Sequence, residues 1–140
     1  MDKIIPFLQH NIWLVLLTAF SGIMLILPAL RGKMSGANSA GTTEAVQLIN
    51  HQNALVLDVR EPNEFAAGHI ANAKHIPLAQ LSSTLKTLEK YKDKTIVVNC
   101  RSGARSAMAC GVLRKNGFAQ VYNLKGGIQA WEQAGLPTVK

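Results

Sequence analysis

The sequence has few of the residues on which disulfide-bonded and metal-binding proteins depend. Its 140 residues include only two cysteines and four histidines. A small secreted scaffold held by disulfide bonds normally carries several cysteines at framework spacing, so both thiols are expected to be free. The histidines form no HExxH pair and the chain has no CxxC motif. We therefore predict neither a metal site nor a cofactor.

Charge is missing from one stretch near the N-terminus. Residues 12–30, IWLVLLTAFSGIMLILPAL, contain no Asp, Glu, Lys or Arg. A helix of that length extends about 28 Å, close to the hydrocarbon thickness of a bilayer. Trp13 lies at the end of the stretch where interfacial aromatic residues are common, and Pro28 lies near the other end. We predict a short N-terminal segment, residues 1–11, followed by a transmembrane helix at 12–30.

Two alternatives to a membrane helix stay open. A buried core helix would need more protein around it than so small a chain provides. A cleavable secretory signal would begin with a positive region, but only Asp2 and Lys3 are charged before the apolar stretch. Residues 37–40 (ANSA) are an imperfect cleavage candidate. Because Arg31 and Lys33 follow the stretch closely, the positive-inside rule places the C-terminal part in the cytoplasm.

The remaining chain divides into a tether and a domain. Residues 31–42 are rich in Gly, Ser and Ala, which indicates a flexible tether. Residues 43–140 are long enough for one compact domain with its own core. The net charge is +7, but the basic side chains are scattered and no aromatic residues alternate with them. We therefore expect no nucleic-acid partner.

Strand and helix patterns alternate through this domain. Leu55–Val59 and Thr95–Asn99 are short apolar runs typical of strands buried on both faces. Weaker strand signals occur at 74–77 and 121–124. Apolar spacing and end signals predict helices at about 43–50, 81–91, 104–116 and 128–134. The alternation predicts an α/β fold with a parallel sheet covered by helices on both sides.

The candidate catalytic residue is Cys100, which follows the second strong strand. The loop Cys100–Arg105, CRSGAR, leads directly into a predicted helix. Ligand sites in parallel α/β sheets lie at the carboxyl ends of the strands. Gly103 allows the loop to curl so that its amides converge, while Arg101, Arg105 and the helix N-terminus add positive potential. These features favour a Cys100 thiolate in a loop with room for one more anion.

Cys110 is expected to differ from Cys100. It falls in the middle of the same predicted helix, among the apolar residues Met108, Val112 and Leu113. Nothing electropositive is fixed beside it by the sequence. We predict an inert core thiol, and a resolving cysteine is the alternative.

Four motifs resemble, in order and spacing, those of single-domain rhodaneses. The first is Leu57–Arg60 with the following EPNEF, and the second is Gly68–Ala73 leading to Ile76–Pro77. The third is the CRSGARS loop, and the fourth is Leu124–Ile128 with Trp131. Together they cover about residues 43–138. One departure is Asn72, which stands where glycine is frequent. With the preceding apolar stretch, the chain is similar to small membrane-anchored bacterial rhodaneses.

The resemblance implies a rhodanese-like α/β fold with a central, mostly parallel five-stranded sheet. It also implies that Cys100 takes sulfur from a donor such as thiosulfate as a persulfide and passes it to a thiol, a protein acceptor or cyanide. Arg101–Arg105 (Arg101, Ser102, Gly103, Ala104, Arg105) would cradle the persulfide, with Arg105 alternatively bracing the loop against Asp58 or Glu64. Asp58 and Arg60 are predicted to be structural supports. The expected location is the bacterial inner membrane, in a single pass through residues 12–30.

Two other functions remain possible on the sequence. Cys-based phosphatases and arsenate reductases resemble this loop, but they have one more residue between Cys and Arg. The C-x4-R spacing of Cys100 and Arg105 gives a smaller cradle, suited to one sulfur atom. The other possibility is a rhodanese-like module that binds a partner at the membrane with little turnover.

Overall fold

The computed structural model describes residues 4–34 and 38–140, which form two compact units. The first unit contains helices α1 (Ile4–His10) and α2 (Ile12–Met34). Among its described residues, no single helix meets the length and apolarity needed to cross a membrane. Taken together, α1 and Ile12–Leu27 do meet them, although the two helices are bent by 84°. The predicted helix at 12–30 lies within α2.

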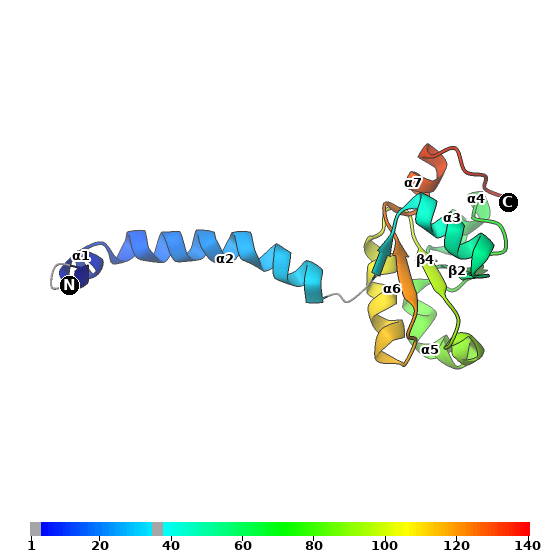
Figure 1. Ribbon diagram of the computed structural model, residues 1–140, viewed down its shortest axis with the longest axis horizontal. Coiled ribbons are helices and arrows are strands. Elements are labelled where there is room, and N and C mark those ends of the chain that lie inside the picture. Colours follow the sequence, from blue (N-terminus) through cyan, green and yellow to red (C-terminus); the bar gives the residue numbers. More distant parts are fainter. Residues whose placement is uncertain (1–3, 35–37) are drawn as a thin grey trace. The chain divides into compact units, whose positions relative to one another are not determined.

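The second unit is an α/β domain built on a five-stranded sheet (Figure 1). The strand order is β1-β5-β4-β2-β3, and every neighbouring pair is parallel. The strands are β1 (Asn38–Ala40), β2 (Leu55–Asp58), β3 (Lys74–His75), β4 (Ile96–Asn99) and β5 (Val121–Leu124). The α/β class and the parallel five-stranded sheet expected from the sequence are confirmed.

Helices cover both faces of the sheet, as the apolar strands require. They are α3 (Thr42–His51), α4 (Pro62–Ala67), α5 (Leu78–Leu88), α6 (Ala104–Lys115) and α7 (Gly127–Gln133), with a 3₁₀ turn at Glu89–Tyr91. Leu81, Leu88 and Leu113 pack α5 and α6 against one face. Leu48 and Trp131 pack α3 and α7 against the other. The central strand β4 is buried along its whole length, which agrees with its uninterrupted apolar sequence.

The start of the domain differs from the predicted tether at residues 31–42. Helix α2 continues to Met34, and Asn38–Ala40 form an edge strand, β1, that pairs with β5. Ala40 is fully buried, and its carbonyl accepts a hydrogen bond from the amide of Lys125. The sequence NSA lacks the β-branched and aromatic residues typical of strands, so the pattern gave no signal for this one. The middle of the predicted tether, residues 35–37, lies outside the described residues.

The register of the two central strands, β2 and β4, places the candidate site residues at one edge of the sheet. Asp58 of β2 is directly opposite Asn99 of β4. The chain therefore leaves both strands at the same carboxyl edge, where Arg60 and Cys100 follow. Helix α4 begins at this edge on Pro62, with a capping box in which Glu61 and Glu64 bond each other's backbone amides. Two segments about 40 residues apart in sequence, the end of β2 with the start of α4 and the loop after β4, therefore meet at this edge.

Candidate active site

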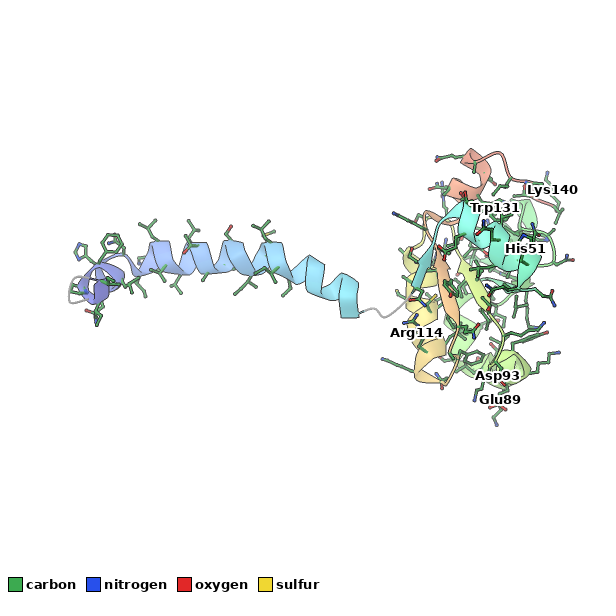
Figure 2. All side chains as sticks on the ribbon, viewed as in Figure 1. His51, Glu89, Asp93, Arg114, Trp131 and Lys140 are labelled. Carbon is green, nitrogen blue, oxygen red and sulfur yellow. The ribbon has the colours of Figure 1, made fainter. Side chains whose placement is uncertain are left out.

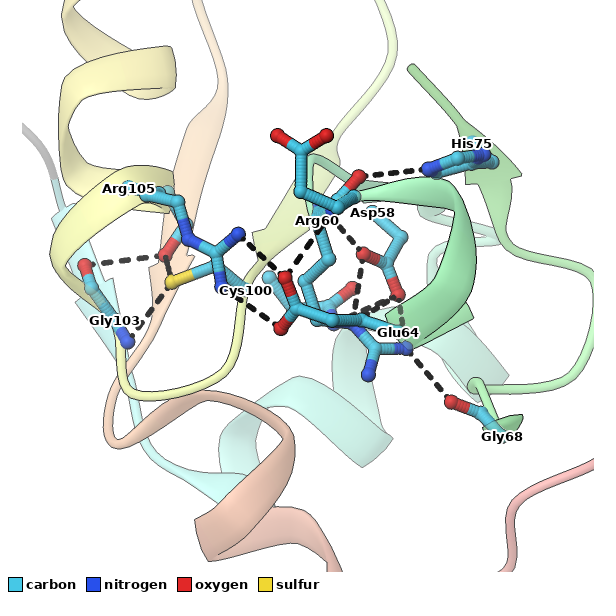
Figure 3. Close-up of polar contacts among 11 residues, drawn as sticks. Asp58, Arg60, Glu64, Gly68, His75, Cys100, Gly103 and Arg105 are labelled. Atoms are coloured by element: carbon cyan, nitrogen blue, oxygen red, sulfur yellow. Dashed lines mark hydrogen bonds and ion pairs between the residues drawn. The ribbon is translucent and has the colours of Figure 1, made fainter. Parts of the chain in front are cut away.

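The sulfur of Cys100 is surrounded by hydrogen-bond donors from its own loop. The Gly103 amide lies 3.0 Å from Sγ and the Ser106 hydroxyl lies 3.3 Å away (Figure 3). The amides of Ser102 and Ser106 are directed at the sulfur as well. Burial raises the pKa of Cys100, but these hydrogen bonds outweigh it and leave the pKa below that of an ordinary thiol. The predicted ring of converging amides is therefore present, and it favours the thiolate.

The loop is closed tightly over the sulfur. Only 1 % of Cys100 is exposed, because the donors of Gly103 and Ser106 already approach Sγ itself. The room for a further anion expected from the sequence is therefore absent in this closed form.

Glycines allow this close packing at two points. Gly103 has φ 105°, a left-handed conformation that turns its amide towards Sγ. Gly127, the first residue of α7, has φ 61°, and a Cβ there would lie 2.5 Å from the backbone of Cys100 and Arg101. The amide of Ile128 donates to the Cys100 carbonyl at 2.8 Å. The GG sequence of the fourth motif thus lets α7 hold the outer side of the loop.

Two residues that the sequence analysis did not single out complete the surroundings of the sulfur. Ser106 is fully buried, and its hydroxyl also lies 3.1 Å from the Gly103 carbonyl and 2.5 Å from the side-chain oxygen of Asn123. The Asn123 amide nitrogen donates to the same Gly103 carbonyl at 3.1 Å. Asn123 could have been recognised as a candidate site residue, because it is a polar side chain within the predicted strand at 121–124. Ser106 could be found because first-turn side chains point back towards the helix N-terminus.

Removing the Ser106 hydroxyl tests how the loop controls the thiolate. We expect Ser106→Ala to raise the pKa of Cys100, because one of its donors is lost, and to lower the thiolate fraction at neutral pH about tenfold. The ultraviolet absorbance of the thiolate, followed against pH, measures the change. Cys110 does not interfere, since burial raises its pKa to about 12. Ser102→Ala keeps its backbone amide and is the control; equal titration curves for Ser106→Ala and the parent would contradict the assignment.

Arg105 braces the loop through its guanidinium. Its guanidinium forms two hydrogen bonds with the Glu64 carboxylate, at 2.8 and 2.9 Å. These bonds lower the pKa of Glu64 to about 2. Of the two positions predicted for Arg105, the structure has the one braced against Glu64 (Figure 3). Arg101, Ser102 and Ala104 are exposed on the loop, and the Arg101 side chain extends towards solvent.

The Glu64–Arg105 pair makes stability depend on pH at the acidic end. Because the folded pKa of Glu64 lies below its ordinary value of 4.5, the pair stabilises the fold above that pH. The contribution is lost as the pH falls towards 2. We expect Glu64→Gln to cost about 1–2 kcal/mol at pH 7, since both side chains are partly exposed, and to cost progressively less below pH 4.5. Urea denaturation at several pH values measures this; a cost that is constant with pH would contradict it.

Asp58 and Arg60 form a buried ion pair beneath the site. The guanidinium Nη2 of Arg60 lies 2.8 Å from Oδ2 of Asp58, and it also donates to the Gly68 carbonyl at 2.7 Å. Asn99 donates to the same Asp58 oxygen at 3.3 Å. The Asp58 side chain is fully buried, and its carboxylate accepts hydrogen bonds from Arg60 and Asn99. This geometry agrees with the supporting role predicted for both residues.

His69 and His75 take part in packing. Their rings stack on the two sides of Phe65, with centroid distances of 3.8 and 4.4 Å. His69 bonds the Phe65 carbonyl, as a turn support should, and His75 bonds the Arg60 carbonyl. Within residues 4–34 and 38–140, no group of three His, Cys, Asp or Glu side chains is placed to hold a metal ion.

Cys110 is a free, fully buried thiol in the core between α5 and α6. Desolvation raises its pKa to about 12, in contrast to Cys100. A thiol with that pKa is almost entirely protonated at neutral pH and is a poor nucleophile. This agrees with the inert core thiol predicted from the sequence.

Comparison with known proteins identifies the same region of the chain. Residues 42–134 match the model of the rhodanese-like domain. A sulfurtransferase of Allochromatium vinosum is 41 % identical over 66 % of this chain and 85 % of its own length. Escherichia coli K12 has an uncharacterized protein, YibN, that is 32 % identical over 100 % of this chain and 99 % of its own.

Solved structures agree with the sequence comparison. The crystal structure of a rhodanese-related protein from Thermoplasma volcanium superimposes with a TM-score of 0.66 and 39 % identity. The superposition covers 73 % of this chain and 97 % of the other. The shared part is therefore the α/β domain that carries Cys100, and the full-length similarity to YibN extends through the N-terminal helices.

Proposed function

Because the chain belongs to the rhodanese-like domain family, we propose that it is a sulfurtransferase that carries one sulfur atom as a persulfide on Cys100. The observation that carries the proposal is the thiolate-stabilising loop: donors from Gly103 and Ser106 on Sγ and a pKa below the ordinary value. The sulfurtransferase of Allochromatium vinosum, 41 % identical, supports the same activity. The loop defines the reaction, and its surroundings define the substrates.

The proposed reaction has two balanced displacements. The Cys100 thiolate attacks the outer sulfur of a small sulfur-containing anion such as thiosulfate. The S–S bond of the donor breaks, and its electrons leave with sulfite. A thiol, protein thiol or cyanide then attacks the outer sulfur of the persulfide and returns Sγ as the thiolate. No oxidant or cofactor is required, because each step breaks one bond to sulfur and forms another.

The hydrogen-bond donors that stabilise the Cys100 thiolate, from Gly103 and Ser106, can also stabilise the negative charge of the persulfide. The persulfide places its negative charge on an outer sulfur, towards which the loop amides can turn when the loop opens. Gly103 supplies the flexibility for this movement, because a glycine crosses left-handed and right-handed conformations with little strain. Arg101, exposed at the start of the loop, attracts the anionic donor.

Direct measurement of the persulfide tests the proposal. The full-length protein is incubated with thiosulfate, and its intact mass is measured before and after cyanide is added. We expect a gain of one sulfur atom, followed by its loss as thiocyanate. An unchanged mass together with hydrolysis of a phosphate ester would favour the phosphatase. An unchanged mass without hydrolysis would favour the partner-binding module.

The loop geometry supports the sulfurtransferase over the phosphatase. A phosphatase of this kind needs a free guanidinium that binds two oxygens of the phosphoryl group in a bidentate manner. Arg105 instead has both terminal nitrogens on Glu64. The C-x4-R spacing of Cys100 and Arg105 also gives a smaller cradle than that of the phosphatases, which have one more residue between Cys and Arg.

We also propose that the N-terminal helices anchor the domain to a bacterial inner membrane in a single pass, with the domain in the cytoplasm. The apolar residues of α1 and α2 and the cationic Arg31 and Lys33 support this. Cleavage as a secretory signal is disfavoured, because the candidate site at 37–40 overlaps β1 and would remove a sheet strand. Membrane fractionation after carbonate washing, with the intact mass, tests the proposal; a soluble protein lacking its first 40 residues would contradict it.

A further inference from the structure

A cavity of about 260 Å³ lies beside the Cys100 loop. Three larger cavities, of about 480, 340 and 300 Å³, lie elsewhere, each against α3. The smaller cavity combines charged side chains with an apolar surface, and it is lined by Arg60, Glu64, Ala67, Arg101, Ile128, Gln129 and Glu132.

The cavity is fixed to the reactive loop by backbone bonds. The amides of Ile128 and Gln129 donate to the carbonyls of Cys100 and Arg101, at 2.8 and 3.2 Å. Glu132 follows on the next turn of α7 and lines the same cavity. Helix α7, which carries Glu132, is therefore hydrogen-bonded to the backbone of Cys100, the residue proposed to hold the sulfur.

Most of the charge in the cavity is already neutralised. Arg60 is paired with Asp58 and Glu64 with Arg105. Arg101 and Glu132 form no ion pair with any of the residues that the structure describes. The cavity therefore presents one free cation and one free anion, within the described part of the chain, to whatever enters it.

We infer that this cavity binds the sulfur acceptor, and that the acceptor is a small zwitterionic thiol of the amino-acid type. Its carboxylate pairs with Arg101 and its ammonium group with Glu132, and Ala67 and Ile128 contact its short aliphatic part. Charge complementarity carries the inference, since a purely anionic acceptor would be repelled by Glu132 and a purely cationic one by Arg101. It rests on the proposed function, because it names the acceptor for the same persulfide.

The transfer needs no further reactant. The acceptor thiolate attacks the outer sulfur, the bond between the outer sulfur and Sγ breaks, and its electron pair stays on Sγ. The acceptor leaves as a persulfide, and the Gly103 and Ser106 donors stabilise the Cys100 thiolate that is released. Glu132 acts by binding the acceptor and takes no part in the bond changes.

Two charged probe thiols separate the contributions of the cavity. The full-length protein is first loaded with sulfur from thiosulfate and freed of excess donor. Single-turnover transfer to cysteamine, which carries an ammonium group, and to 3-mercaptopropionate, which carries a carboxylate, is then timed. The two thiols differ in intrinsic reactivity, but this difference is the same for every variant. The ratio of the two rate constants therefore reports the charge preference alone.

Glu132→Lys is the test, and Glu89→Lys is the control with the same charge change. Glu89 lies at the end of the domain opposite Trp131, the neighbour of Glu132 in sequence (Figure 2). We expect Glu132→Lys to shift the ratio about fivefold towards 3-mercaptopropionate, with a smaller shift for Glu132→Gln and none for Glu89→Lys. High salt should reduce the shift. Equal sulfur loading of all variants confirms that they are folded.

Two outcomes overturn the inference. If every variant is loaded with sulfur but the ratio for Glu132→Lys equals that of the parent, the acceptor does not contact Glu132, while the sulfurtransferase stands. If the parent accepts no sulfur from thiosulfate, the proposed function itself fails and the acceptor site fails with it. Loading is measured before the acceptor is added, so the two failures are distinguishable.

Discussion

Replacing Cys100 by serine is expected to abolish sulfur transfer, while the same replacement at Cys110 leaves it intact. The Cys100→Ser protein should gain no sulfur from thiosulfate and form no thiocyanate above the uncatalysed rate. The reason is that a serine hydroxyl is not appreciably ionised at neutral pH, even with the donors of Gly103 and Ser106 beside it. The oxygen also cannot form the S–S bond in which the sulfur is carried.

Cys110→Ser is the matched control. It changes the same atom in a residue of α6, the helix that follows the Cys100 loop, where the thiol has a pKa of about 12. We expect a protein that is somewhat less stable, because a hydroxyl replaces a core thiol, and that loads one sulfur per chain. Mass spectrometry of both variants after thiosulfate treatment measures the result. If Cys100→Ser is loaded with sulfur, Cys100 is not the sulfur carrier. If Cys110→Ser remains folded but is not loaded, Cys110 is required for the reaction.

The largest expected effect on stability comes from Asp58→Ala. Both members of the Asp58–Arg60 pair are buried, with 0 % and 6 % of their side chains exposed. Removing the carboxylate leaves the guanidinium in the interior with the Gly68 carbonyl as its one hydrogen-bond partner among the residues that the structure describes. We expect a loss of about 3–5 kcal/mol in the free energy of unfolding, which urea denaturation measures.

A double variant shows whether the lost stability is due to the unpaired charge. Removing both charges, in Asp58→Ala with Arg60→Met, leaves no uncompensated ion, because methionine keeps much of the aliphatic length of arginine without its charge. The double variant should therefore be more stable than Asp58→Ala alone. If the two variants are equally unstable, the loss arises from the packing of Asp58 and Asn99, and the ion pair has no special part in it.

The sequence was sufficient to predict the elements that carry strong local signals. Two strands, Leu55–Val59 and Thr95–Asn99, were found within one residue of β2 and β4, because short apolar runs with β-branched residues favour a buried strand. The loop at Cys100 could be interpreted because a glycine at a strand–helix junction restricts how the backbone can turn. By contrast, β1 was predicted as tether: its three residues are held by pairing with β5, which no local pattern encodes.

The same distinction between local and distant contacts applies to the site. The donor of Gly103 follows from residues next to Cys100, but the sequence left Arg105 either in the persulfide cradle or bracing the loop against Asp58 or Glu64. Asn123 is 20 residues from Gly103 and meets it only because β4 and β5 are adjacent. The closing of the loop over Sγ also depends on the tight approach of Gly127, which requires three-dimensional packing to be known. Spacing alone therefore indicated a more open loop than the structure has.

The hold of α7 on the loop has a mechanical consequence. Trp131 anchors this helix by donating a hydrogen bond to the Pro137 carbonyl at 3.0 Å, and the helix amides in turn bond the carbonyls of Cys100 and Arg101. A displacement of Pro137 would therefore be passed through the two turns of α7 to the backbone of Cys100. The C-terminal segment, although distant in sequence from Cys100, is thus mechanically coupled to the loop that surrounds the sulfur.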